Sequence, residues 1–207
     1  MNERSLIFVL EMRQRDENKE NQVRTKALEM LVSEGFSGFS MQKLAKAACV
    51  SPATLYIYYK DKDDLIIQIG IEEGRKMTEA TFENFDPDMS FAEGLRIQWK
   101  NRAKYWLENP ISTQFSEQIK HSPYRERVNA AFKNEYHEKM GKFVRNAMNR
   151  NELVALPIDV YWTIAFAPLY MLIRFHQEGK SIDSQEFTLT DTVFDKTLEL
   201  VLKALKP

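Results

Sequence analysis

Two short helical segments separated by three residues constrain this chain more than any other feature. They lie in the stretch SMQKLAKAACVSPATLYIYYK, residues 40–60. Ser40 is suited to cap the first segment and Ser51 the second, because a serine hydroxyl accepts a hydrogen bond from an unpaired N–H group in the first turn of a helix. Pro52 fits the first helical position of the second segment, where no N–H group is needed. The spacing therefore predicts a helix, a tight turn and a second helix.

The second of these helices carries apolar side chains on both of its faces. With about 100° of rotation per residue, Tyr59 falls beside Leu55, and both face inward. Ala53 and Ile57 point in the opposite direction, with Tyr56 at their side. A face that meets only water would carry Lys and Glu, whereas small, methyl-bearing and hydroxyl-bearing side chains suit the major groove of DNA. The alternative is a pair of ordinary core helices with no role in DNA binding.

The rest of the chain is predicted to be helical, which makes the fold class all-α. The 207 residues include only seven Gly and seven Pro, too few for a fold rich in strands and turns. An earlier helix, with Val23, Ala27 and Leu31 on its apolar face, ends at Gly35. Further helices are predicted between proline and glycine breaks, near residues 62–83, 90–108, 111–120, 124–150, 158–178 and 190–206.

The sequence lacks the patterns that would indicate an enzyme or a metal site. His121, His137 and His176 are far apart and do not have the spacing of metal ligands. There is no glycine-rich phosphate loop and no nucleophile elbow, and the single cysteine, Cys49, stands in the predicted helix-turn-helix. We therefore expect no catalytic residues, no metal and no cofactor. A helical adaptor that binds only proteins stays open as an alternative, although it leaves the outward face of residues 53–57 unexplained.

Residues 25–66, TKALEMLVSEGFSGFSMQKLAKAACVSPATLYIYYKDKDDLI, resemble the amino-terminal domain of the TetR family of transcriptional regulators. The likeness rests on an Ala-Leu helix ending in Gly-Phe, a Ser-Met start to the second helix, Val-Ser before the third, and then Thr-Leu-Tyr and Tyr59. Cys49 departs from the pattern, since such proteins commonly have glycine in this turn. If the position needs a positive φ, a cysteine there is strained.

The resemblance implies a three-helix DNA-binding head joined to a larger helical body that dimerises and holds a ligand. We accordingly expect an amino-terminal extension over residues 1–17, for which disorder is one option, a DNA-binding domain over residues 18–78, and a ligand-binding and dimerisation domain over residues 79–207. The expected function is a sequence-specific transcriptional regulator, a repressor that a small molecule releases from a palindromic operator. A DNA-binding regulator without an inducer is the alternative.

The expected DNA contacts come from the second and third helices and the lysines that follow them. Phosphate contacts position such a protein, and base contacts give it sequence preference. Ala53, Thr54 and Ile57 are expected nearest to the bases. The whole predicted set is Ser40, Gln42, Lys43, Ser51, Pro52, Ala53, Thr54, Tyr56, Ile57, Tyr58, Lys60 and Lys62.

Two features of the predicted body indicate further partners. The helices near residues 158–178 and 190–206 are too apolar for lone surface helices, which predicts a two-fold homodimer, with a purely intramolecular core as the alternative. Many aromatic side chains with polar tips predict a pocket for a small apolar or aromatic ligand, with plain core packing as the alternative. The predicted lining residues are Trp99, Trp106, Phe115, His121, Tyr124, Tyr136, Trp162, Phe166 and Tyr170.

The first eleven residues, MNERSLIFVLE, do not fit the helical head that follows them. Met12 is the expected natural start, and a short extra arm is the alternative. The apolar run Leu6–Leu10 is too short for a membrane span or for the core of a signal peptide. We therefore expect a cytoplasmic protein with no membrane partner.

Overall fold

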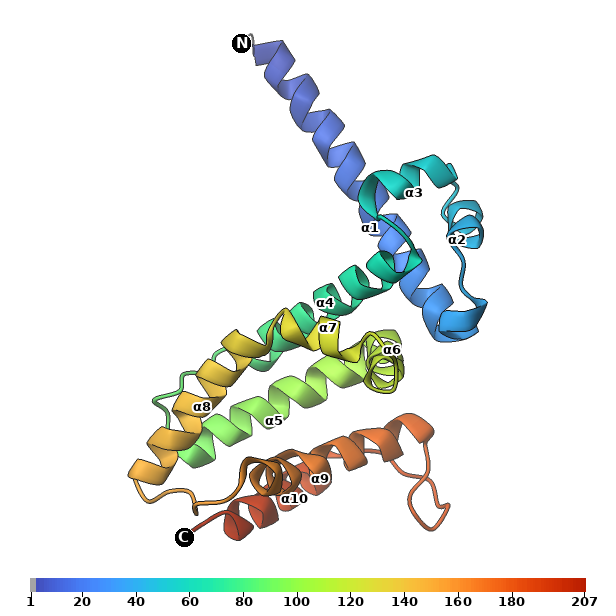
Figure 1. Cartoon of the computed structure of the whole chain (residues 1–207). Coiled ribbons are helices and arrows are strands. Elements are labelled where there is room, and N and C mark those ends of the chain that lie inside the picture. The colour runs from blue at the N-terminus through green and yellow to red at the C-terminus, as the bar shows by residue number, and fades with distance from the viewer. Residues whose placement is uncertain (1–2) are drawn as a thin grey trace. The chain divides into compact units, whose positions relative to one another are not determined.

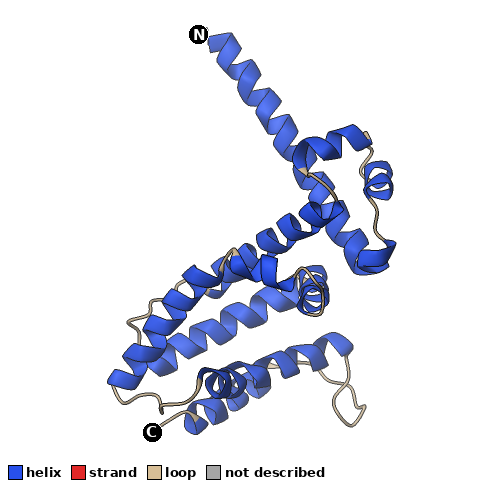
Figure 2. Ribbon diagram, in the orientation of Figure 1, coloured by secondary structure: helices blue, strands red, loops and turns tan. Residues whose placement is uncertain are grey.

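The computed structural model describes the backbone of residues 3–207 and the side chains of residues 18–132 and 136–207. Helices joined by loops make up this part of the chain (Figures 1 and 2), so the predicted all-α fold class is confirmed. Within it, the only extended pairing is an isolated bridge between Lys180 and Glu186. The side chains of the predicted extension over residues 1–17, including the expected start at Met12, lie outside the described residues.

The first four helices contain the predicted helix-turn-helix. A non-helical residue, Gly35, interrupts the first of them at φ 69° and ψ 172°, where the sequence predicted its end. Asp61 caps the fourth helix as its sequence suggests, because the Asp64 N–H donates to Asp61 Oδ1 at 2.8 Å. The four helices are α1 (Glu3–Gly38), α2 (Met41–Ala47), α3 (Pro52–Tyr58) and α4 (Lys62–Thr81).

The other six helices follow the predicted ranges except at one place. The prediction of a single helix over residues 124–150 is wrong, because two helices, α7 and α8, occupy that stretch. Phe132 stands at the N-cap of α8, and its ring packs so tightly on Gly74 that a Cβ atom there would lie 2.4 Å from Phe132 Cε1. The six are α5 (Phe91–Glu108), α6 (Pro110–Lys120), α7 (Arg125–Ala130), α8 (Lys133–Asn149), α9 (Ile158–Glu178) and α10 (Asp191–Ala204).

The chain divides into two compact units, and each is built from two separate stretches of sequence. The head unit contains Met1–Glu73 and Ile111–Asn129, and the body unit contains Gly74–Pro110 and Ala130–Pro207. Residues 111–129, which the sequence placed with the ligand-binding domain, thus group with the helix-turn-helix. The predicted division of function at residue 78 stays a prediction.

Each unit has its own apolar core. In the head unit, Ala27 and Leu31 of α1, Leu44 of α2 and Leu55 of α3 are all fully buried. In the body unit, α5 packs against α8, α9 and α10. Among the described residues, α9 is the one helix long and apolar enough to cross a membrane. Its Tyr161, Ala165, Phe166, Leu169 and Ile173 are buried in the body core, which accounts for one side of this apolar helix.

Candidate functional site

Each helix of the helix-turn-helix begins at a serine cap. The Ser40 hydroxyl accepts from the Lys43 N–H at 3.2 Å, and the Ser51 hydroxyl accepts from the Thr54 N–H at 3.1 Å. The hydroxyls of Ser51 and Thr54 also share a hydrogen bond of 2.8 Å, and Pro52 begins α3 as predicted. The two serines therefore set the direction of α2 and α3 as well as lying on the predicted contact surface.

The turn between these helices requires the left-handed conformation that the sequence left open. Cys49 has φ 54° and an exposed side chain. The Val50 N–H donates to the Ala45 carbonyl at 3.0 Å, which closes the end of α2 over this residue. A glycine would adopt this φ without strain, so Cys49 stores a small conformational cost in the turn.

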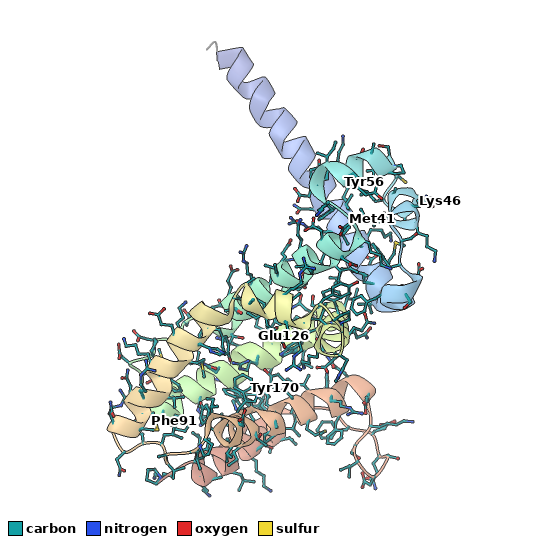
Figure 3. The ribbon with its side chains drawn as sticks, in the orientation of Figure 1. Met41, Lys46, Tyr56, Phe91, Glu126 and Tyr170 are labelled. Carbon is teal, nitrogen blue, oxygen red and sulfur yellow. The ribbon has the colours of Figure 1, made fainter. Side chains whose placement is uncertain are left out.

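The two faces of α3 differ as its sequence predicts. Leu55 and Tyr59 are buried beneath it, with 0% and 1% of their surfaces exposed. Ala53 is exposed, and so are Tyr56 and Ile57, at 55% and 76% (Figure 3 labels Tyr56). A short helix thus presents a small, a hydroxyl-bearing and a branched apolar side chain together on one open face.

The lysines around this face fall into two kinds. Lys43 Nζ is held by Glu34 Oε2 at 2.6 Å and the Gly38 carbonyl at 2.8 Å, and Lys62 Nζ donates to the Phe36 carbonyl at 2.6 Å. Lys46, labelled in Figure 3, and Lys60 are exposed, and their ammonium groups have no partner among the described residues. Of the remaining predicted contacts, Gln42 is exposed and Tyr58 is half-buried.

Three of the predicted ligand residues lie in the head unit. Phe115 and Tyr124 both pack edge-on against Phe36, with ring centroids 6.4 Å and 5.3 Å away. The Tyr124 hydroxyl donates to Asp63 Oδ1 at 2.7 Å. Burial and this carboxylate raise the pKa of Tyr124 to about 12. His121 is exposed in the loop after α6. Phe115 and Tyr124 thus join α6 and the following loop to α1 and α4.

The other six predicted ligand residues lie in the body unit, where four of them surround Arg102 of α5. The Tyr136 and Tyr170 hydroxyls accept from its guanidinium at 2.6 Å and 2.8 Å. The rings of Phe166 and Trp162 lie 4.4 Å and 5.4 Å from the guanidinium carbon. Tyr170, labelled in Figure 3, therefore belongs to a cluster of aromatic rings around one buried positive charge.

The last two predicted ligand residues flank this cluster. Trp106 lies edge-on to Tyr170, with ring centroids 6.3 Å apart. Trp99 is fully buried and donates its indole N–H to the Ala165 carbonyl at 2.7 Å, which ties α5 to α9. The structure thus brings all six together along α5, α8 and α9.

Known proteins resemble this chain over nearly its whole length. Residues 24–69 match the family described as bacterial regulatory proteins, tetR family. An HTH-type transcriptional regulator of Haemophilus influenzae is 28% identical over 196 residues, which are 94% of this chain and 100% of that protein. A TetR family transcription regulator from Marinobacter aquaeolei has a structure with a TM-score of 0.76 and 28% identity, covering 93% of this chain and 98% of that one. The chain belongs to the TetR family of transcriptional regulators.

A second solved structure supports the fold of this TetR-family regulator. A TetR-family transcriptional regulator from Haemophilus influenzae covers 94% of the chain and 100% of its own, with a TM-score of 0.76 and 23% identity. The family consists of DNA-binding helix-turn-helix regulators and not of enzymes. Among residues 18–132 and 136–207, no three His, Cys, Asp or Glu side chains gather in the way that a metal site requires.

Two residues of this regulator's candidate sites were missed by sequence reasoning, although each left a signal. Lys46 follows Lys43 by three residues on α2, so helical rotation places both on the same exposed side. Arg102 stands on the inward stripe of α5 with Trp99 and Trp106, at helical spacing. A charged residue on an apolar stripe is the pattern that could have identified it.

Proposed function

We propose that this TetR-family regulator is a cytoplasmic homodimeric repressor that binds a palindromic operator and leaves it when a small molecule binds in the body unit. The observation that carries the DNA-binding part is the open face of α3. Ile57 and Tyr56 are 76% and 55% exposed although their side chains are largely apolar. The exposed ammonium groups of Lys46 and Lys60 at the sides of this face have no partner among the described residues. Apolar and hydroxyl groups for base edges, with cations for phosphates, form the usual pattern of a major-groove helix.

Within this proposal, the surroundings of each side chain in the helix-turn-helix indicate whether it contacts bases or phosphates. Ala53, Thr54 and Ile57 lie nearest to the bases, since they occupy the outward face of α3. Lys46 and Lys60 neutralise phosphates, because no carboxylate competes for them among the described residues. The remaining members hold the helices in place or contact the DNA backbone; they are Ser40, Gln42, Lys43, Ser51, Pro52, Tyr56, Tyr58 and Lys62.

The dimer part of the proposal rests on apolar side chains that the chain leaves uncovered. Met171 of α9 and Leu200 of α10 are 46% and 58% exposed. Val160, Ile164 and Ala167 continue the Met171 stripe at helical spacing. A second copy that covers this stripe would give an isologous interface and set two recognition helices about 34 Å apart.

This interface differs in detail from the helix faces that the sequence suggested. Several apolar side chains of the two helices that the sequence predicted to pair across the dimer are buried inside the body unit, so they cannot meet a partner. They are Tyr161, Ala165, Leu169, Leu198, Val201 and Leu205. The proposed interface is therefore the opposite side of α9 and α10, with Met171 and Leu200 at its centre.

One experiment tests the dimer and the operator together. Light scattering of the full chain should give the mass of two chains at micromolar concentration, and Met171→Glu should give one. The same variant should bind the DNA beside its own gene more weakly, because two linked heads bind more tightly than one. Ile158→Glu is the matched control, since Ile158 is 65% exposed on α9 but lies off the stripe. A single-chain mass for the unaltered protein would end the dimer proposal.

DNA binding has its own test within the same assay. Ile57→Ala should weaken binding at the preferred site by about 1 kcal/mol and leave binding to unrelated DNA unchanged. An equal loss on both DNAs would remove Ile57 from the base contacts. Induction is tested separately, by asking whether a compound that changes the tryptophan fluorescence of the body also releases the DNA.

A further inference from the structure

The centre of the body unit contains a charge that no carboxylate among the described side chains neutralises. Arg102 is 1% exposed, and its three described hydrogen bonds all go to neutral groups. It donates to the Tyr136 hydroxyl at 2.6 Å, the Tyr170 hydroxyl at 2.8 Å and Gln98 Oε1 at 3.1 Å. No aspartate or glutamate forms an ion pair with it among the residues whose side chains are described. A guanidinium stays charged at any pH that a protein tolerates.

Two polar groups in this cluster also lack a hydrogen-bond partner within the described part of the chain. One is Arg102 Nε, and the other is the hydroxyl of Tyr161, whose side chain is 2% exposed. Both residues contact the ring of Phe166. The guanidinium carbon lies 4.4 Å from its centroid, and the Tyr161 ring lies edge-on to it with centroids 6.2 Å apart. An unpaired cationic N–H and an unpaired phenol O–H thus border the same buried ring.

Burying such a group of side chains lowers the stability of the folded state. A buried charge without a counterion loses its hydration, and hydrogen bonds to neutral oxygens replace only part of it. Buried donors without acceptors are rare in native proteins, and each calls for an explanation. An anion supplied from outside would accept from both donors and neutralise the charge. The carboxylate is the planar anion that matches a guanidinium best.

We infer that the ligand of the body unit is an organic carboxylate, which binds Arg102 through its anion and accepts a hydrogen bond from the Tyr161 hydroxyl. This inference rests on the proposed function, because it identifies the chemical class of the proposed inducer. The apolar part of the ligand lies against the rings of Phe166, Tyr136 and Trp162. A small inorganic anion would leave these rings without a guest, and a cation would meet a like charge.

The same cluster shows where such a ligand enters. Phe166 and Tyr161 are closed off by the core, at 0% and 2% exposed. Trp162 is 36% exposed, and its ring lies 5.4 Å from the Arg102 guanidinium carbon. We expect the ligand to reach the charge past this side chain, because it is the most exposed ring of the cluster. Its fluorescence therefore reports directly on occupation of the site.

The test compares acids with their neutral amides on the full chain without DNA. Octanoate, decanoate, phenylpropionate and indoleacetate are titrated at fixed ionic strength against the corresponding primary amides, with tryptophan fluorescence or calorimetry as the readout. At least one acid should bind saturably, and about tenfold or more tightly than its amide, since only the acid supplies a charged acceptor.

Two variants assign the binding to the named side chains. Tyr161→Phe removes an oxygen that has no partner in the free protein, so the thermal midpoint should not fall, whereas affinity for the acid should fall about fivefold to tenfold. Arg102→Gln should abolish the preference for acid over amide. Tyr124→Phe is the control, because it removes a hydroxyl from the head unit and should leave both affinities unchanged. If circular dichroism shows Arg102→Gln to be unfolded, Tyr161→Phe alone decides.

Three results would overturn the inference. They are amides that bind as tightly as their acids, acids that bind both variants as they bind the unaltered protein, and no saturable binding of any acid up to about 1 mM. The induction proposal fails differently. Acids that bind with the expected preference yet leave the DNA bound contradict induction alone, whereas neutral compounds that release DNA where acids do not contradict only the carboxylate.

Discussion

Arg24 of the head unit and Arg102 of the body unit differ in the partners of their charge and in their exposure to solvent. Arg24 reaches Glu20 at 2.7 Å and Glu72 at 2.5 Å, and 30% of its side chain meets solvent. Arg102 is fully enclosed, and its hydrogen bonds to described residues go to two phenols and an amide. The head unit neutralises its own inner charge, so its shape needs no ligand. The body unit buries a charge that has no carboxylate beside it among the described residues, so we expect its stability to depend on what it binds.

Unpaired cations occur in the head unit too, but at its surface. Lys46 and Lys60 are exposed, and water solvates them at no cost to the fold. In the proposed complex with DNA, phosphates replace that water. An unpaired charge is thus expected to change the free energy of folding little at the surface of the head unit and more in the core of the body unit, because only the second charge is buried.

The largest effect is expected at the ring beneath the Arg102 guanidinium. Phe166→Ala should lower the free energy of unfolding by about 3–5 kcal/mol, because the ring is fully buried. Trp162→Ala removes a larger ring from the same cation and should cost no more than about 2 kcal/mol, since that ring already meets water. Urea unfolding followed by circular dichroism measures both. Equal losses would mean that Trp162 is core and not an entrance.

Replacing each arginine by methionine tests the comparison itself. Arg24→Met should lower the free energy of unfolding by about 1 kcal/mol, and by less at high salt, because the lost ion pairs are partly exposed. Arg102→Met should leave the ligand-free value unchanged or raise it by up to about 2 kcal/mol, since the desolvation of the charge disappears with its neutral hydrogen bonds. A greater loss at Arg102 than at Arg24 would show that the body unit already compensates its charge.

The surface lysines should affect DNA binding without affecting the fold. Lys46→Ala and Lys60→Ala should each reduce the slope of log affinity against log salt by about 1. Lys62→Ala should instead lower the free energy of unfolding by about 1 kcal/mol, because its ammonium donates to the Phe36 carbonyl. DNA titrations over a series of salt concentrations separate the two. An unchanged slope for Lys46→Ala would place α2 away from the phosphates.

The smallest effect is expected in the turn between α2 and α3. Cys49→Gly should raise the free energy of unfolding by about 0.5–1 kcal/mol, because glycine adopts φ 54° without strain. Cys49→Ala keeps the Cβ atom and serves as the control, so it should bring no gain. A thermal melt of both variants decides, and an equal gain from alanine would locate the cost in the thiol and not in the backbone.

The helix-turn-helix could be predicted from the sequence because its determinants lie close together along the chain. A serine caps an N–H group three residues away, and Leu55 and Tyr59 share a face at a spacing of four. Determinants this local can be recognised in the sequence itself. The match of residues 24–69 to the tetR family covers the same stretch.

The body unit was less readable because its decisive contacts join residues far apart in the chain. The break between α7 and α8 has no proline or glycine to mark it, and the ring of Phe132 instead packs against Gly74. The surroundings of Arg102 come from α8 and α9, so its missing counterion could not be seen from α5 alone. The sequence shows which side chains are aromatic, and only the fold shows what they surround.

The discontinuous head unit has a consequence for anyone who builds hybrid biosensors from regulators of this family. A chimera with a single junction after α4 would carry Asp63 and Val32 into a foreign chain without their partners. The Tyr124 hydroxyl donates to Asp63, and the Gln118 side chain donates to the Val32 carbonyl at 3.0 Å. A working transplant of this DNA specificity must therefore move two segments at once, the one that ends at Glu73 and the one from Ile111 to Asn129.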